Sequence, residues 1–313
     1  MPAAADWIID AASHPNAATQ AALAHLKVLL KQTWAPSFES KGVTATTTTA
    51  VPGLESPVPI TRGEIDLPES VDMFDIFSVI MTASLRPSWD ERTESAEVRE
   101  HEADKNAIAY SVQLSFARDL CVSISPVMYD AELDAHLVVQ RSVEHKDIPD
   151  VSGKVRAEVR LAAIMVTKNA SGGHRLTYIV DVDTKGSIPS AILKIVSSST
   201  PMCAGKMIEY VQTHGAPARF VSGKTTLITN NSFDRATGRA TFEMKGEPIH
   251  AYSPIDAKIF PTGAAIQVTG GEVTVTKEGR GVVIKSSGPA TVSVVITKHS
   301  GAAGDIVVNG VAI

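Results

Sequence analysis

The stretch that decides the expected fold is residues 176–215, LTYIVDVDTKGSIPSAILKIVSSSTPMCAGKMIEYVQTHG. Residues 176–183 are rich in β-branched and apolar side chains, which favours a strand. Residues 183–189 then contain lysine, glycine and serine, as turns do. Pro189 suits the start of a helix and Gly215 suits its end. The sequence therefore predicts a strand, a tight turn and one long helix over residues 190–214.

The residues before this stretch predict a helix, a hairpin, a second helix and a series of strands. Four further strands at nearly regular spacing indicate an antiparallel sheet. The expected helices are residues 16–32 and 71–85, the second ended by Pro87; the hairpin is residues 38–51 and 58–65 around Pro52-Gly53; the strands are residues 108–114, 120–126, 137–143 and 155–166. This order predicts an α+β fold in which a curved antiparallel sheet grips one long C-terminal helix.

After residue 215 the sequence loses helical periodicity and becomes rich in Thr, Val, Gly and Ser. Seven short strands separated by glycine-containing turns predict a small β-sandwich or barrel. We expect these strands at residues 225–229, 239–244, 265–268, 272–276, 281–285, 291–297 and 305–308. The expected organisation is an N-terminal extension (1–13), a first domain (14–215) and a β-sandwich-like domain (216–313).

Composition excludes several function classes. The net charge is −5 and no basic run reaches five residues, which argues against nucleic acid as a partner and against a polybasic membrane anchor. The two cysteines, Cys121 and Cys203, lie far apart and indicate neither a disulfide framework nor a zinc site. The N-terminus has no signal-peptide pattern. We expect a cytoplasmic protein without metal or cofactor.

Four stretches of the first domain resemble the START (StAR-related lipid-transfer) domain. They are residues 86–90 (RPSWD), 117–122 (ARDLCV), 154–158 (KVRAE) and 183–189 (DTKGSIP). Each motif alone is weakly specific, but the four occur in the family's order and spacing across about 200 residues. No family is apparent for the C-terminal region.

The resemblance implies a tunnel between the sheet and the last helix that holds one apolar lipid, such as a sterol, carotenoid, ceramide or phospholipid. It implies a lipid-transfer protein that contacts membranes transiently. A lipid enclosed in such a tunnel can leave only through a gate, so loops or the last helix must move.

Strand periodicity predicts which side chains face this tunnel. Leu120, Val122 and Ile124 share the apolar face of one strand. Sterol-transporting relatives often carry a basic residue at the place of Ile124, and this chain departs from that pattern. We therefore expect an uncharged lumen, because an unpaired buried charge costs several kcal/mol, and a ligand of low polarity. Ser111, Gln113 and Tyr178 are the expected hydrogen-bond partners for a ligand hydroxyl.

The lid over the tunnel is expected on the last helix. Its candidate lipid-contacting residues are Ile192, Ile195, Val196, Ser199, Met202, Cys203 and Met207. Trp89 and Asp90 are expected to be structural, and Arg118 to pair with Asp119. Whether Arg160 faces the tunnel is left open; if it does, a phosphate or carboxylate head group becomes plausible.

Two other functions are left open. One is an enzyme on the same scaffold, such as a polyketide cyclase or hydrolase, which would need several convergent polar groups at the end of the tunnel. No G-x-S-x-G motif or other catalytic set is apparent, so we expect no catalytic residues. The other is a lipid-sensing scaffold that binds a protein partner through its C-terminal domain.

Overall fold

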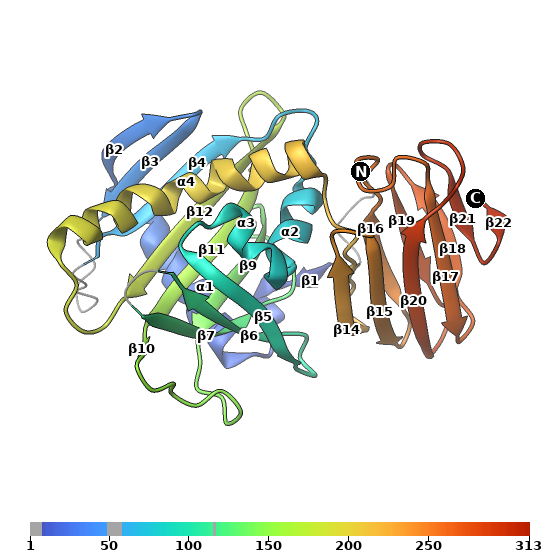
Figure 1. Cartoon of the computed structure of the whole chain (residues 1–313), viewed down its shortest axis with the longest axis horizontal. Coiled ribbons are helices and arrows are strands. Elements are labelled where there is room, and N and C mark those ends of the chain that lie inside the picture. Colours follow the sequence, from blue (N-terminus) through green and yellow to red (C-terminus); the bar gives the residue numbers. More distant parts are fainter. Residues whose placement is uncertain (1–7, 49–57, 115–116) are drawn as a thin grey trace. The chain divides into compact units, whose positions relative to one another are not determined.

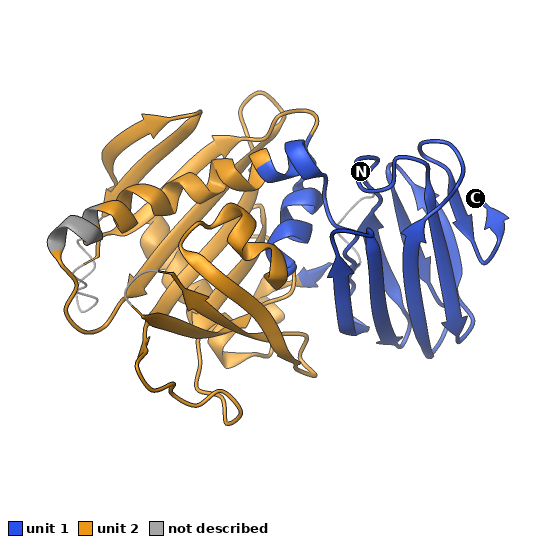
Figure 2. Ribbon diagram, viewed as in Figure 1, with its two compact units in different colours: residues 1–9, 71–82, 210–313 blue, residues 10–70, 83–209 orange. Residues whose placement is uncertain are grey.

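The computed structural model describes residues 8–48, 58–114 and 117–313, apart from the side chains of residues 190–192 and 194 (Figure 1). Its contacts divide the chain into two compact units (Figure 2). Unit 1 comprises residues 1–9, 71–82 and 210–313, and unit 2 comprises residues 10–70 and 83–209. The boundaries expected at residues 13 and 215 stay predictions. No helix in these described ranges is long and apolar enough to cross a membrane.

Unit 2 is built on a large antiparallel sheet. Its strands run in the order β2-β3-β4-β12-β11-β9-β7-β6-β5, β8 pairs with β9, and the short β10 adds to β7 in parallel. The strands are β2 (Ala35–Ser40), β3 (Val43–Thr48), β4 (Ile60–Asp66), β5 (Thr93–His101), β6 (Ala107–Gln113), β7 (Arg118–Ile124), β8 (Met128–Asp130), β9 (Ala135–Ser142), β10 (Val155–Arg156), β11 (Glu158–Lys168) and β12 (His174–Asp183). Before them come β1 (Ile9–Asp10) and a 3-10 turn, Ala11–Ser13.

The long helix α4 (Ser190–His214) approaches one face of this sheet so closely that glycine is required at the contact (Figure 1). A Cβ on Gly63 of β4 would overlap the backbone of Pro201 in α4. A Cβ on Gly205 would lie 2.9 Å from Val43. The sheet and the C-terminal helix confirm the expected helix-grip fold.

Helix α1 (Ala17–Leu30) contacts strands β9, β11 and β7. Asn16 caps its first turn by accepting a hydrogen bond from Thr19 N at 3.0 Å. The partly buried His25 of α1 has its Nε2 2.8 Å from Asp181 Oδ2 of β12. The expected helix at residues 16–32 is therefore present, and Asp181 faces α1.

Two details of the N-terminal half differ from the sequence predictions. Residues 38–51 are not one strand, because Lys41 and Gly42, with φ of 49° and 78°, form a tight turn between β2 and β3. The turn expected at residues 52–53 lies outside the described residues. Residues 71–85 form α2 (Met73–Met81) and a 3-10 turn (Ala83–Leu85), and Pro87 lies in the first turn of α3 (Arg86–Trp89) instead of ending a helix.

The C-terminal part of unit 1 is a sandwich of two sheets, as expected. One sheet has the order β13-β16-β19-β18 and the other β14-β15-β20-β17-β21-β22. Side chains from both, among them Phe242, Val294 and Ile284, fill one core. The strands are β13 (Val221–Ser222), β14 (Thr226–Asp234), β15 (Arg239–Gly246), β16 (His250–Pro254), β17 (Ala264–Gly270), β18 (Thr274–Glu278), β19 (Gly281–Lys285), β20 (Ala290–Lys298), β21 (Ile306–Val308) and β22 (Val311–Ala312). Strands β13, β16 and β22 were not predicted from the sequence.

Helix α2 packs on this sandwich within unit 1. The ring centroids of Phe74 and Tyr252 are 5.1 Å apart, and the fully buried Asp75 forms an ion pair with Arg280. Burial nevertheless raises the pKa of Asp75, so the ion pair offsets only part of the cost of burying its charge.

The glycine contact between β4 and α4 gives a test of the fold. Gly63→Ala should lower the free energy of unfolding by about 1–3 kcal/mol or more, because the added methyl group meets rigid helix backbone. Chemical denaturation checks the value. Gly288→Ala is the control, since a Cβ there meets nothing within 4 Å. Equal effects of the two substitutions would contradict the close approach of α4.

Candidate functional site

A cavity of about 190 Å³ lies in unit 2 between the sheet and α4. Most of its wall comes from apolar side chains of four elements: β7, β11, β12 and the N-terminal half of α4. The lining residues are Arg86, Asp90, Arg92, Gln113, Arg118, Leu120, Val122, Gln140, Ala157, Val159, Ala162, Tyr178, Val180, Val182, Thr184, Ile188, Ile195 and Val196.

The apolar wall follows from strand alternation. Leu120 and Val122 of β7 line the cavity, as do Val180 and Val182 of β12, while Asp181 between them faces α1. Alternate residues of one strand thus serve two purposes. One set makes the cavity wall, and the other holds the helix behind the sheet.

Arg160 lies at a bulge in β11, where the register with β12 shifts between Val159 and Leu161. Its guanidinium is 3.6 Å from Asp181 Oδ1 and 3.4 Å from Asp183 Oδ2. The side chain is not part of the cavity lining. Arg160 therefore interacts with acidic groups of β12.

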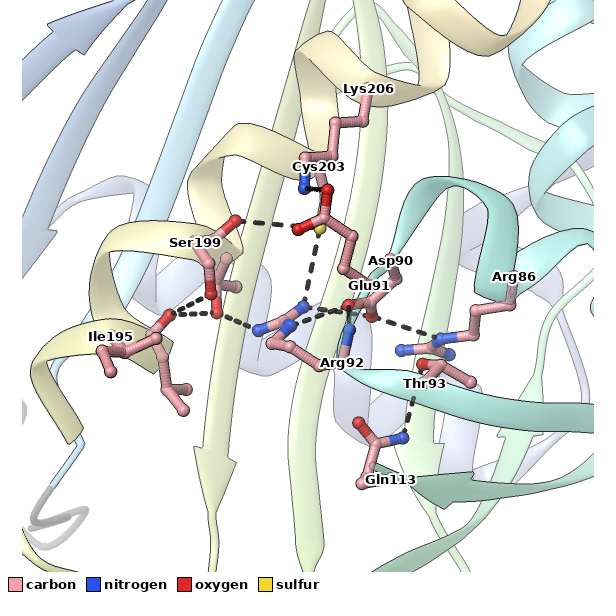
Figure 3. A network of polar contacts seen from close by, with 12 residues as sticks. Arg86, Asp90, Glu91, Arg92, Thr93, Gln113, Ile195, Ser199, Cys203 and Lys206 are labelled. Atoms are coloured by element: carbon pink, nitrogen blue, oxygen red, sulfur yellow. Dashed lines mark hydrogen bonds and ion pairs between the residues drawn. The ribbon is translucent and has the colours of Figure 1, made fainter. Parts of the chain in front are cut away.

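One end of the cavity is charged (Figure 3). Arg92 Nε donates to Asp90 Oδ1 at 2.7 Å and Arg92 Nη2 donates to Asp90 Oδ2 at 3.1 Å, which makes a bidentate ion pair. Arg86 approaches the same carboxylate at 3.5 Å, and its Nη1 donates to Gln140 Oε1 at 3.4 Å. Two guanidinium groups thus share one buried carboxylate.

The same segment is tied to α4. Arg92 donates to Thr200 Oγ1, and its Nη2 lies 3.6 Å from Cys203 Sγ. The neighbouring Glu91 forms an ion pair of 2.7 Å with Lys206 (Figure 3). Residues 91 and 92 therefore connect the start of β5 to the middle of the helix that covers the cavity.

Arg118 and Asp119 do not pair with each other, so that expectation is wrong. As neighbours on a strand they point to opposite faces. Asp119 accepts two hydrogen bonds from Arg156, at 3.0 and 3.1 Å. Arg118 lines the cavity and donates to the carbonyl oxygens of Thr184 and Lys185 at 3.1 and 2.7 Å, which holds the turn before α4.

Burial and charge set the protonation of the cavity groups. Burial alone would raise the pKa of Asp90, but the charges of Arg92 and Arg86 outweigh burial and lower it to about 2. Burial raises the pKa of the Cys203 thiol to about 12 and raises the pKa of Tyr178 above its ordinary value. Near neutral pH Asp90 is therefore ionised, while Cys203 and Tyr178 are protonated.

Six of the thirteen predicted lipid-contacting residues line the cavity. They are Gln113, Leu120, Val122, Tyr178, Ile195 and Val196. Six others do not: Ser111, Ile124, Cys203 and Met207 are buried elsewhere in the fold, and Ser199 and Met202 are partly buried on α4. The side chain of Ile192 lies outside the described residues. Contact of all thirteen with a ligand stays a prediction.

The expectation of an uncharged lumen is wrong. Asp90 was expected to be structural, and the three arginines Arg86, Arg92 and Arg118 were not predicted to line the cavity. The sequence could have indicated these ion pairs, because Arg86 and Asp90 lie four residues apart and Asp90 and Arg92 lie two apart. Such spacings allow side chains to meet, on a helix and in extended chain respectively.

The ion pair predicts a dependence of stability on pH. Because the pKa of Asp90 is lower in the folded protein than its ordinary value of 3.8, its stabilising effect is present above about pH 4 and disappears as the pH falls towards 2. The difference in free energy of unfolding between wild type and Asp90→Asn should shrink by about 2 kcal/mol over this range.

Denaturant titrations at pH 5, 4, 3 and 2 measure this difference. Glu39→Gln, at an exposed position of β2, serves as the control and should change little. A difference for Asp90→Asn that stays constant with pH would contradict the ion pair.

Comparison with known proteins adds an independent observation. Residues 69–216 match the family model described as the START domain. No curated protein sequence matches the chain.

Two human structures are similar. Human StAR-related lipid transfer protein 5 is 19% identical, with a TM-score of 0.53 over 63% of this chain and 97% of that one. Human STARD10 is 18% identical, with a TM-score of 0.48 over 61% of this chain and 81% of that one. At this identity the first similarity shows the fold alone. Residues 69–216 thus match the START domain in sequence, unit 2 has a START-like fold, and the β-rich region that follows is additional to it.

Proposed function

We propose that this protein carries one amphipathic lipid in the cavity and exchanges it with membranes. The acyl chain would lie along the apolar wall of β7, β12 and α4. The head group would lie at the charged end, against Arg92 and Arg86. The observation that carries the proposal is a cavity with an apolar wall and a charged end on a START fold.

The charges favour a head group that bears an anion. At the charged end two arginines, Arg86 and Arg92, share the single carboxylate of Asp90, so this end carries excess positive charge. A carboxylate or phosphate would compensate this charge, and guanidinium groups bind both well. Of a sterol, a carotenoid, a ceramide and a phospholipid, only the phospholipid carries such a group. Each buried methylene of its chains would add about 0.8 kcal/mol.

The polar side chains in the cavity favour an enzyme, but the protonation states of Asp90 and Cys203 argue against one. Convergent polar groups are present, as an enzyme requires. A general base works best with a pKa near the working pH, whereas the pKa of Asp90 is lowered to about 2 by its arginines against the effect of burial. Burial raises the pKa of Cys203 to about 12, which makes it a poor nucleophile. These directions support a carrier without catalysis.

Exposed apolar side chains near the cavity support transient membrane contact. Ile195 lines the cavity and is 63% exposed. Leu114 is 62% exposed, and its backbone N–H donates to the Arg92 carbonyl at 2.8 Å. Val155 is also exposed and pairs with Arg118 in the sheet. Such side chains can insert between lipid head groups while the ligand passes.

The first test is the lipid itself. The full chain is purified natively, extracted with organic solvent and analysed by mass spectrometry, and we expect one anionic lipid per chain. Arg92→Met should weaken binding of a fluorescent fatty acid about tenfold or more, because a hydrogen bond to a charged group contributes about 1.5–3 kcal/mol. Binding of a fluorescent sterol should change little.

Lys206→Met is the matched control, because Lys206 is a cation of the same contact region but does not line the cavity. Arg92→Lys replaces the methionine variant if that variant does not fold. Absence of any lipid, even after incubation with mixed vesicles, would overturn the carrier function. Equal fatty-acid affinity of wild type and Arg92→Met would overturn only the head-group assignment.

The membrane contact has its own test. Leu114→Glu should slow lipid transfer between vesicles several-fold without changing the equilibrium affinity, because it places a charge at the membrane-facing rim. Val28→Glu is the control, since Val28 is also exposed but lies on α1, behind the sheet. A transfer rate for Leu114→Glu equal to that of the control would contradict this role.

A further inference from the structure

Buried charges in the described part of the chain are paired, with one exception. Six aspartate or arginine side chains are buried there. Five of them have an opposite charge within an ion pair: Asp75 with Arg280, Asp90 with Arg92, Asp119 with Arg156, Asp130 with Lys27, and Asp181 with His25 and Arg160. The sixth, Arg219, has no carboxylate partner among the described residues.

The backbone at Arg219 is fixed by its neighbours in the chain. It is 8% exposed and stands between Ala218 and Phe220, which are both buried in the core of the β-sandwich. Phe220 packs edge-on against Phe242 of β15 at 5.0 Å between ring centroids. The backbone at residue 219 is thus held on both sides by side chains that pack in the core.

An irregularity in β14 positions Asn231, the polar partner of Arg219 in the part of the chain that the structure describes. Its Nη1 donates to Oδ1 of Asn231 in β14. The register between β14 and β15 shifts between Thr229 and Ser232, and Asn230 there has a φ of 46°. Bulges of this kind re-aim side chains and are frequent beside binding sites. The amide of Asn231 thus points at Arg219 because the strand departs from regular pairing.

Within the described ranges, no carboxylate therefore compensates the charge of Arg219. Burial lowers its pKa to about 10, so it is still a cation at neutral pH. Burying an unpaired charge costs several kcal/mol. A neutral amide oxygen accepts from only one of the roughly five N–H donors of a guanidinium. The remaining donors and the charge match an oxyanion, which a guanidinium binds in bidentate fashion.

We infer that Arg219 and Asn231 form a binding site for a small oxyanion, a carboxylate or a phosphate, in the C-terminal β-sandwich. Only 8% of Arg219 is exposed, which excludes a large surface of a partner macromolecule and restricts the ligand to a small anion. The site shares no residue with the lipid cavity and does not depend on the proposed lipid function. The C-terminal β-sandwich would therefore bind a ligand that is separate from the lipid in the cavity.

The test compares thermal unfolding of the full chain at pH 7 in sodium chloride, sodium phosphate and sodium acetate at equal ionic strength. A bound anion stabilises the folded state in a saturable way, so phosphate or acetate should raise the unfolding midpoint of wild type by a few degrees. Arg219→Met should be more stable than wild type in chloride, because an uncompensated charge is replaced by an apolar side chain. It should also lose the response to the anions.

Arg239→Met is the matched control, because Arg239 is exposed on β15 of the same sandwich, and it should keep the wild-type response. It also corrects for the general stabilisation that phosphate gives to folded proteins. A response to phosphate alone or to acetate alone assigns the site to that anion.

A second measurement tests the site even if the Arg219→Met variant does not fold. Isothermal titration of inorganic phosphate into wild type and Arg219→Lys should give an affinity at least tenfold lower for the lysine variant, which keeps the charge but loses the bidentate geometry. Equal midpoints of wild type in all three salts, together with no heat of phosphate binding, would overturn the site. A methionine variant that responds to the anions as wild type does would overturn it as well.

Discussion

The ion pair between Arg92 and Asp90 is the interaction on which the cavity depends. Asp90 is only 1% exposed, and its carboxylate receives two hydrogen bonds from Arg92 and faces Arg86. Removal of Asp90 would leave the guanidinium groups of Arg92 and Arg86 without their shared carboxylate, at a cost of about 3–5 kcal/mol. The pair also positions Arg92 for its contacts with Thr200 and Cys203 of α4. The charged end of the cavity and the helix over it are thus held by one group of side chains.

This arrangement links ligand binding to the covering helix. An anionic head group that binds Arg92 would compete with Thr200 for the same guanidinium donors. Binding would then weaken one of the contacts that hold α4 on the sheet, whereas the close contact at Gly63 and Pro201 would persist. A lipid carrier needs both properties, since the helix must yield at the cavity without leaving the fold.

Most of the fold could be predicted from the sequence, because hydrophobic periodicity and turn residues determine helices, strands and turns locally. The long helix follows from residues 189–215, and the wall residues Leu120 and Val122 follow from strand alternation. Turns formed by less usual residues were harder to predict. Lys41 adopts a left-handed conformation beside Gly42. Lysine is not a typical turn residue, so its presence does not predict such a turn.

The charged end of the cavity was not predicted, for a different reason. Periodicity places Asp90 and Arg92 on one side of the chain but does not show what that side faces. Arg92 meets Thr200 only because α4, more than a hundred residues later, packs over the start of β5. Ile124 shares the strand face of Leu120 yet lies outside the cavity lining. The extent of the cavity is a property of the assembled elements, and no single strand encodes it.

The most direct test of the central claim is a crystal structure of the protein with a fatty acid that carries bromine at the end of its chain. We expect the anomalous signal of bromine beside the apolar wall formed by Val180 and Val196, with the carboxylate within hydrogen-bond distance of Arg92. Bromine beside Arg92, or a fatty acid bound elsewhere with the cavity empty, would contradict the account.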